Sequence, residues 1–187
     1  MARRNIVERY SRATVEKRVE IILDNYSNFD CMLDGFERSL YLVILTERED
    51  KRNSEKSDLG VRVQTSNISD PTGNTGTNEA ELKRAIHEGD WLSAIQGTIN
   101  PEKHRKEIVT IHRMRMGYEL VTQQFGQLKP RQRRLFKKYL SGEDEPVDIA
   151  DEFGITVEAL RTRVYRYRLK VKESALYHME NMQQICA

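Results

Sequence analysis

The residues whose chemistry is clearest in this chain are cations near its C-terminal end. They follow one another without an intervening acidic residue, at Arg161, Arg163, Arg166, Arg168, Lys170 and Lys172. An arginine forms short, charge-assisted hydrogen bonds with phosphate oxygens, and such contacts release counterions from a nucleic acid. The pattern therefore indicates a surface that binds a polyanion. The alternative is a solvated face that only aids solubility, but six neighbouring cations repel one another, which makes this the weaker explanation.

A single helix is predicted to carry these cations. Leu160, Val164, Tyr167 and Val171 recur at i, i+4, i+7 and i+11, which places them on one apolar stripe of a helix over 157–172. Thr156 precedes this stretch and is a good N-cap, because its hydroxyl can accept a free backbone N–H. The helix is expected to pack through the stripe and to expose its cations elsewhere.

Two shorter helices are predicted to position that helix. Lys129-Pro130 begins the first, over 131–140, and Ser141-Gly142 ends it. Pro146 begins the second, over 147–153, with Ile149, Ala150 and Phe153 facing inward. Gly154 allows the tight turn into the third helix. The stretch 128–172 is therefore predicted to form a helix-turn-helix.

At these residues the chain resembles the helix-turn-helix of the fourth region of primary-type bacterial sigma factors. Ala150, Gly154 and Thr156 match the family's alanine, turn glycine and helix-starting Ser or Thr, and residues 161–163 match its Arg/Lys, Ser/Thr and Arg succession. The whole layout is also similar to phage late-gene regulators of the ArpU and RinA type. The resemblance implies a transcription regulator that acts with RNA polymerase.

The helix-turn-helix predicts which residues meet duplex DNA. The start of the recognition helix can enter a major groove, where Glu158 would accept from cytosine and Arg161 would reach guanine. Phosphates are expected to meet Arg163, Arg166 and Arg168, while the start of the first helix clamps the flanking backbone. The complete predicted DNA-binding set is Thr156, Val157, Glu158, Arg161, Thr162, Arg163, Arg166, Arg168, Lys170, Lys129, Arg131 and Arg133.

The charge distribution agrees with this prediction. The chain has 187 residues and a net charge of only +2. The segment 129–172 nevertheless holds 12 of the 31 Lys and Arg but only 7 of the 29 Asp and Glu. The basic surplus therefore lies in the predicted DNA-binding segment, as a protein that binds nucleic acid requires.

The rest of the chain is expected to be helical, so the predicted fold class is all-α. Residues 1–49 are predicted to form an N-terminal region with one helix over 3–25 and another over 30–49. Residues 50–78 are predicted to form a linker or long loop, in which Val61 and Val63 alternate as in a short strand. Residues 79–187 form a helical region ending in the helix-turn-helix. The wide apolar surface of the second helix around 41–45 is expected to meet either a helix of the same chain or a second copy in a homo-oligomer.

No enzyme, cofactor or metal centre is predicted. The four histidines have no metal-ligand spacing, and Cys31 and Cys186 lie far apart, which favours a reduced, cytoplasmic protein. No apolar run is long enough to span a membrane. Two other functions stay open: a phage small-terminase-like protein that recognises DNA for packaging, and a helical adaptor that binds proteins.

Overall fold

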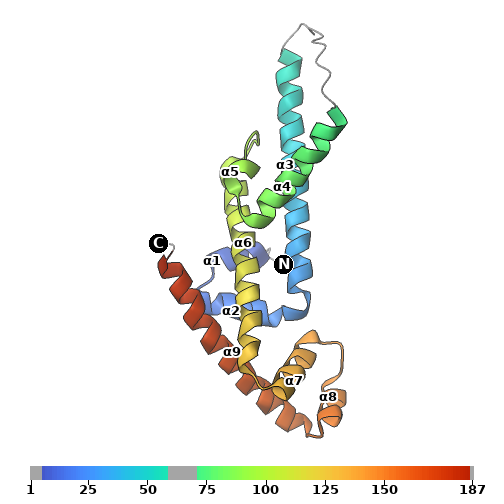
Figure 1. Ribbon diagram of the computed structural model, residues 1–187, viewed down its shortest axis with the longest axis vertical. Helices are drawn as coiled ribbons and strands as arrows, with labels where there is room; N and C mark the ends of the chain where they lie inside the picture. Colours follow the sequence, from blue (N-terminus) through green and yellow to red (C-terminus); the bar gives the residue numbers. More distant parts are fainter. Residues whose placement is uncertain (1–5, 59–70, 186–187) are drawn as a thin grey trace, which may run out of the picture. The chain divides into compact units, whose positions relative to one another are not determined.

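The computed structural model describes residues 6–58 and 71–185, and every regular element within these two ranges is a helix (Figure 1). The all-α prediction is confirmed. The elements are α1 (Ile6–Arg12), α2 (Val15–Asp24), η1 (Tyr26–Asn28), α3 (Phe29–Asp58), α4 (Pro71–Glu88), α5 (Trp91–Ala94), α6 (Pro101–Gln124), η2 (Phe125–Gln127), α7 (Pro130–Ser141), α8 (Pro146–Phe153) and α9 (Val157–Ile185).

The chain divides into two compact units. Unit 1 comprises Met1–Met32 with Met114–Ala187, and unit 2 comprises Leu33–Arg113. The two long helices α3 and α6 therefore contribute to both units. This division differs from the predicted order of regions, because α2 packs against α9 and places the start and the end of the chain in the same unit (Figure 1).

The prediction of one continuous helix over 3–25 is wrong, because α1 and α2 are separate helices within this stretch. Thr14 adopts an extended conformation and its Oγ1 accepts from Lys17 N at 3.3 Å, so it is the N-cap of α2. The Arg18 side chain turns back and donates to the carbonyls of Tyr10 (3.1 Å) and Ser11 (3.3 Å), which lie in the last turn of α1. Residues 3–5 lie outside the described residues.

Aromatic side chains form much of the core of unit 1. Phe29, Phe125 and Phe136 are almost completely buried. The rings of Phe125 and Phe136 pack edge to face, with their centroids 5.3 Å apart. Tyr118 stacks on Phe29 with ring centroids 5.4 Å apart. Each such pair adds about 0.5–1.5 kcal/mol beyond the burial of its area. The core thereby joins α3 and α6 to the first helix of the predicted helix-turn-helix.

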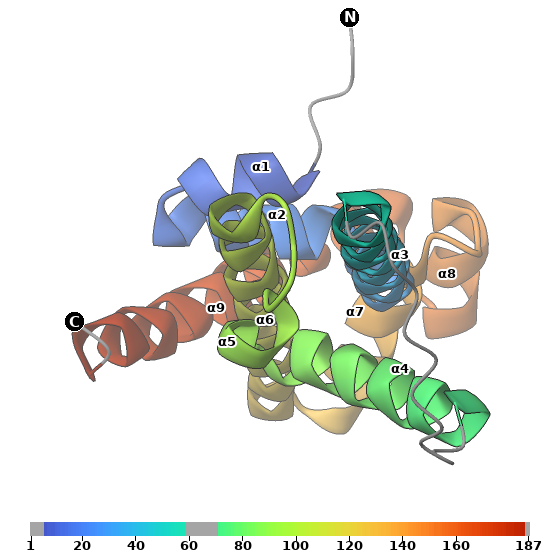
Figure 2. The ribbon, with the colours of Figure 1, turned by 90° about the horizontal axis from the view of Figure 1, so that it is seen from above.

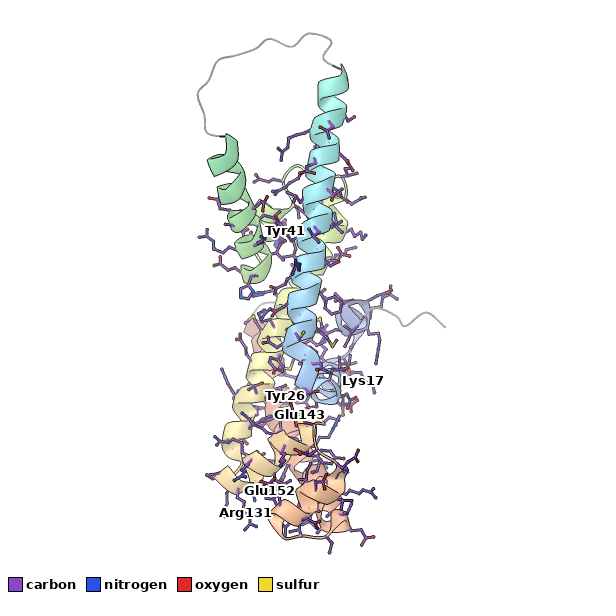
Figure 3. The ribbon with its side chains drawn as sticks, turned by 90° about the vertical axis from the view of Figure 1, so that its right-hand side faces the viewer. Lys17, Tyr26, Tyr41, Arg131, Glu143 and Glu152 are labelled. Atoms are coloured by element: carbon purple, nitrogen blue, oxygen red, sulfur yellow. The ribbon has the colours of Figure 1, made fainter. Side chains whose placement is uncertain are left out.

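In unit 2, α3 lies against α4 and α5. Tyr41 is buried on the side of α3 that faces α4, where its hydroxyl donates to Glu79 Oε2 at 2.9 Å (Figure 3). Gly89 (φ +77°) ends α4, and Asp90 caps α5 by accepting from Ser93 N. Gly89 and Asp90 therefore separate α4 from α5. Figure 2 shows α3 nearly end-on and α4 from its side, so the axes of the two helices are inclined to each other.

The predicted linker 50–78 is helical at both of its ends. α3 continues to Asp58 instead of ending near Glu49, and α4 already begins at Pro71. The charged stretch from Glu47 onward remains helical because Glu, Lys and Arg are good helix formers. Residues 59–70, which include Val61 and Val63, lie outside the described residues.

Candidate nucleic-acid interface

The three predicted helices of the helix-turn-helix are present at α7, α8 and α9 (Figure 1). The apolar faces predicted for the second and third of these helices are confirmed. Leu135, Ile149, Ala150 and Phe153 are buried, as are Leu160, Val164 and Val171 along α9. Tyr167 is half-buried, and its ring packs edge to face on the Phe136 ring, with the two ring centroids 6.2 Å apart. The first half of α9 is therefore held rigidly by the two shorter helices.

The turn between α8 and α9 shows the predicted local chemistry. Gly154 has φ +63°, a left-handed conformation in which other residues are strained. Its N–H bonds the carbonyls that end α8, and Thr156 Oγ1 then accepts from Ala159 N at 3.2 Å. Both bonds satisfy backbone groups at helix ends, which fixes the direction in which α9 leaves the turn.

An acidic side chain of α8 ties α7 to α8. Glu152 bonds Lys138 and lies 2.5 Å from Arg134 Nη2, and Lys138 also lies 3.4 Å from Asp144. The hydrogen bond from Lys138 lowers the pKa of Glu152, and the same bond raises the pKa of Lys138. These two cations of α7 are therefore occupied within the protein. They are separate from the predicted DNA-binding set.

A basic hollow of about 730 Å³ lies where the start of α7 meets the turn before α9. Four cations line it: Lys129 and Arg131 from α7, and Arg163 and Arg166 from α9. Among the described residues that line it there is no Asp or Glu. The structure thus brings together four of the predicted phosphate-contacting residues, although more than 30 positions separate the two pairs in sequence.

Arg131 and Arg133 also stabilise the fold around this hollow. Arg131 Nη2 donates to the carbonyl of Phe153 at 2.8 Å, at the end of α8 (Figure 3). Arg133 donates to the carbonyls of Phe125 (2.9 Å) and Gly126 (3.1 Å) in η2. Each guanidinium therefore satisfies carbonyls that end a helix. Arg133 is committed to this contact, whereas Arg131 both holds α8 and lines the hollow.

The cations of α9 fall into two groups. In the part of the chain that the structure describes, no carboxylate pairs with Arg161, Arg163 or Arg166, and all three are exposed. Arg168, by contrast, forms an ion pair with Asp24, and Lys170 Nζ donates to the Gln127 carbonyl at 3.2 Å. The predicted phosphate contacts of Arg168 and Lys170 therefore compete with contacts inside unit 1.

The start of α9 carries the side chains that are predicted to contact bases. Glu158, Arg161 and Thr162 are exposed, Val157 is half-buried, and Thr156 is exposed while it caps the helix. Tyr165, which the predicted set lacks, is 65% exposed and follows Arg161 by one helical turn. Because Tyr165 lies four residues after Arg161, a helix places both side chains on one face, and this spacing could have added Tyr165 to the predicted set. Its ring adds an apolar surface to the same face.

Comparisons of the chain with family models, with curated proteins and with solved structures give no match. The resemblance to sigma factors and to phage late-gene regulators therefore stays a hypothesis. Within residues 6–58 and 71–185, no group of three or more His, Cys, Asp or Glu side chains is placed to hold a metal ion. None of the described helices combines the length and apolar character needed to cross a bilayer.

Proposed function

We propose that this protein binds duplex DNA through its helix-turn-helix and regulates transcription. The observation that supports this proposal most strongly is the basic hollow, whose four cations come from two helices and face no carboxylate among its described lining residues. A DNA backbone presents phosphates to such a surface, and α9 can then enter the adjacent major groove. Arg163 and Arg166 contact phosphates in this arrangement, and Lys129 and Arg131 hold the flanking backbone.

Sequence preference is proposed to come from the first turns of α9. Glu158, Arg161 and Thr162 share the exposed face at spacings of three and four residues, which places them side by side on a helix. Arg161 can form two hydrogen bonds with guanine, and Glu158 can accept from cytosine. The Tyr165 ring can contact a thymine methyl group on the same groove wall.

RNA polymerase is the proposed protein partner, on the basis of the resemblance to sigma factors. The proposed role is that of a sigma-like activator. Two alternatives have separate tests. A packaging protein would form a large ring, which light scattering detects. An adaptor would bind no DNA at low salt; the exposed apolar side chains Leu92 and Ile99 of unit 2 favour that function.

The test of DNA binding is fluorescence anisotropy with a random duplex, over a range of salt concentrations. Arg163→Ala and Arg166→Ala should each weaken binding to all sequences and reduce the slope of log K against log salt by about 1. Arg161→Ala should instead relax specificity at one position by roughly 1–3 kcal/mol, measured on duplexes that the wild type selects from a random pool and on their single-base variants.

Arg84→Ala is the matched control, because Arg84 is an exposed cation of α4 that lies outside the helix-turn-helix, with its Nε 3.8 Å from Glu88 Oε2. It removes the same charge without altering the helix-turn-helix, and it should leave the salt slope unchanged. An equal loss of binding in Arg84→Ala and Arg163→Ala would contradict a localised interface. A wild-type protein that fails to bind duplex DNA at low salt would reject the proposed function.

A further inference from the structure

A row of carboxylates on α2 lies against the second group of α9 cations. The row consists of Glu16, Glu20 and Asp24, which follow one another at four-residue steps and therefore share one face of α2. Asp24 pairs with Arg168, while Lys172 Nζ lies 2.6 Å from Glu16 Oε1 and 2.9 Å from Glu20 Oε1. We call these three residues the acidic row.

The acidic row is fixed in place by the packing of α2 on α9. Val19, Ile22 and Leu23 are buried on α2, and Val171 and Ala175 are buried on α9. Hydrogen bonds from Lys172 and Lys17 hold the pKa of Glu20 well below its usual range, and the bonds with Glu16 and Glu20 raise the pKa of Lys172. Glu20 is therefore ionised at neutral pH, and the packing of α2 on α9 keeps the whole row beside the cations of α9.

We propose that the acidic row sets the limit of the DNA-binding surface on α9, ending it at Arg166. The row occupies Arg168 and Lys172, and its exposed carboxylates repel any phosphate that approaches beyond that point. Asp24 and Glu16 have side chains 60% and 62% exposed, so they present negative charge to solvent next to the cations they pair with. This inference rests on the proposed function, because it concerns the extent of the same DNA interface.

The two pairs differ in what they contribute to the fold. Lys172 and Glu20 have side chains only 21% and 29% exposed, so their pair helps to hold α2 on α9. Arg168 and Asp24 are 34% and 60% exposed, and such surface pairs contribute little to stability. Asp24 can therefore be changed without unfolding unit 1, and the effect on DNA can be measured by itself.

The test is Asp24→Asn, which keeps the shape of the side chain and removes its charge. The freed Arg168 should reach one further phosphate, so the slope of log K against log salt should steepen by about 1. Affinity for a random duplex at low salt should rise by about threefold or more. Arg168→Ala should leave the wild-type slope unchanged but abolish the gain when it is combined with Asp24→Asn, a non-additive pattern that identifies direct coupling.

The matched control is Glu8→Gln, which removes the same charge from α1, where Glu8 pairs with Arg12 of its own helix. It should leave the salt slope at the wild-type value, and circular dichroism should show both variants folded. An Asp24→Asn slope equal to the wild-type slope would overturn the inference while leaving DNA binding intact. A loss of slope in the single Arg168→Ala variant would overturn it too, because Arg168 would then contact DNA despite Asp24. Absence of binding by every variant would instead reject the proposed function.

Discussion

Both units contain carboxylates held by several hydrogen bonds, but the two arrangements differ in burial and in partners. In unit 2, Glu47 accepts from Ile99 N (2.8 Å), from Asn100 N (3.1 Å) and from Asn100 Nδ2 (3.1 Å), and it lies 3.0 Å from His104 Nε2. His104 is completely buried. In unit 1, the acidic row of α2 meets only side-chain cations at a solvated surface.

This difference shows when a charged cluster is structural and when it can serve binding. Glu47 supplies acceptors to backbone N–H groups just before α6, and no other described group does so for them. The lysines and arginines that meet the acidic row can exchange their carboxylates for other anions or for water. We therefore expect unit 2 to depend on its cluster for stability, and unit 1 to depend on its cluster mainly for the extent of the proposed DNA contact.

The largest predicted effect is that of Glu47→Gln. Burial alone would raise the pKa of Glu47, but hydrogen bonds from Asn100, His104 and Ile99 outweigh it and lower the pKa from 4.5 to about 2. The shift corresponds to about 3 kcal/mol of stability at neutral pH. Urea unfolding followed by circular dichroism should show a loss of this size, because the new amide N–H groups face donors.

The unfolding free energy of Glu47→Gln should also differ from that of the wild type in its dependence on pH. The pKa of Glu47 is lower in the folded protein, so its contribution is complete above pH 4.5 and is lost as pH falls toward about 2. The difference in unfolding free energy between wild type and Glu47→Gln should therefore shrink across that range. Glu49→Gln, on the exposed side of α3, is the control and should change little. A difference that stays constant with pH would contradict the structural role of the Glu47 charge.

A smaller effect is expected at the turn before α9. Gly154→Ala forces a side chain into a left-handed conformation, although the space around the new Cβ is open. The strain should cost about 1–2 kcal/mol, measured as a lower melting temperature. Gly126→Ala tests the interpretation, because Gly126 also has open space but no positive φ. Equal destabilisation by the two substitutions would show that backbone strain is not the cause.

The smallest effect is expected from Glu20→Gln in the acidic row. Lys172 keeps Glu16 as a partner when Glu20 loses its charge, and the Glu20 side chain is 29% exposed to water that can replace the bond. Hydrogen bonds lower the pKa of Glu20 to about 2, as they do for Glu47, but solvent screening at this more exposed site should reduce the loss of unfolding free energy to about 1 kcal/mol. A loss as large as that of Glu47→Gln, in the same urea experiment, would remove the contrast between the two clusters.

The helix-turn-helix could be predicted from the sequence because its signals are local. Pro130 and Pro146 begin helices, Gly154 permits the turn, and Thr156 caps α9, each within a few residues of the feature it determines. The break between α1 and α2 also has a local signal in Thr14, but the amphipathic pattern on both sides suggested one continuous helix.

The contacts that could not be predicted join residues far apart in sequence. Asp24 and Arg168 are 144 positions apart, and neither residue type indicates its partner. For the same reason, the sequence indicated a uniform row of cations on α9, whereas the structure divides it at Arg166. The role of Glu47 was missed as well, because a glutamate in a charged stretch resembles a solvated one until the backbone of Ile99 and Asn100 is placed beside it.

The continuity of α9 has a mechanical consequence. At about 1.5 Å per residue, the 29 residues of Val157–Ile185 form a rod of roughly 43 Å. Its first turns point the proposed reading side chains outward, while Val171 and Ala175 are clamped further along. A rotation of the clamped part of α9 therefore turns the exposed face of its first turns through a similar angle. A molecule that binds the far end of α9 would change the orientation of the proposed base-contacting side chains without contacting the DNA.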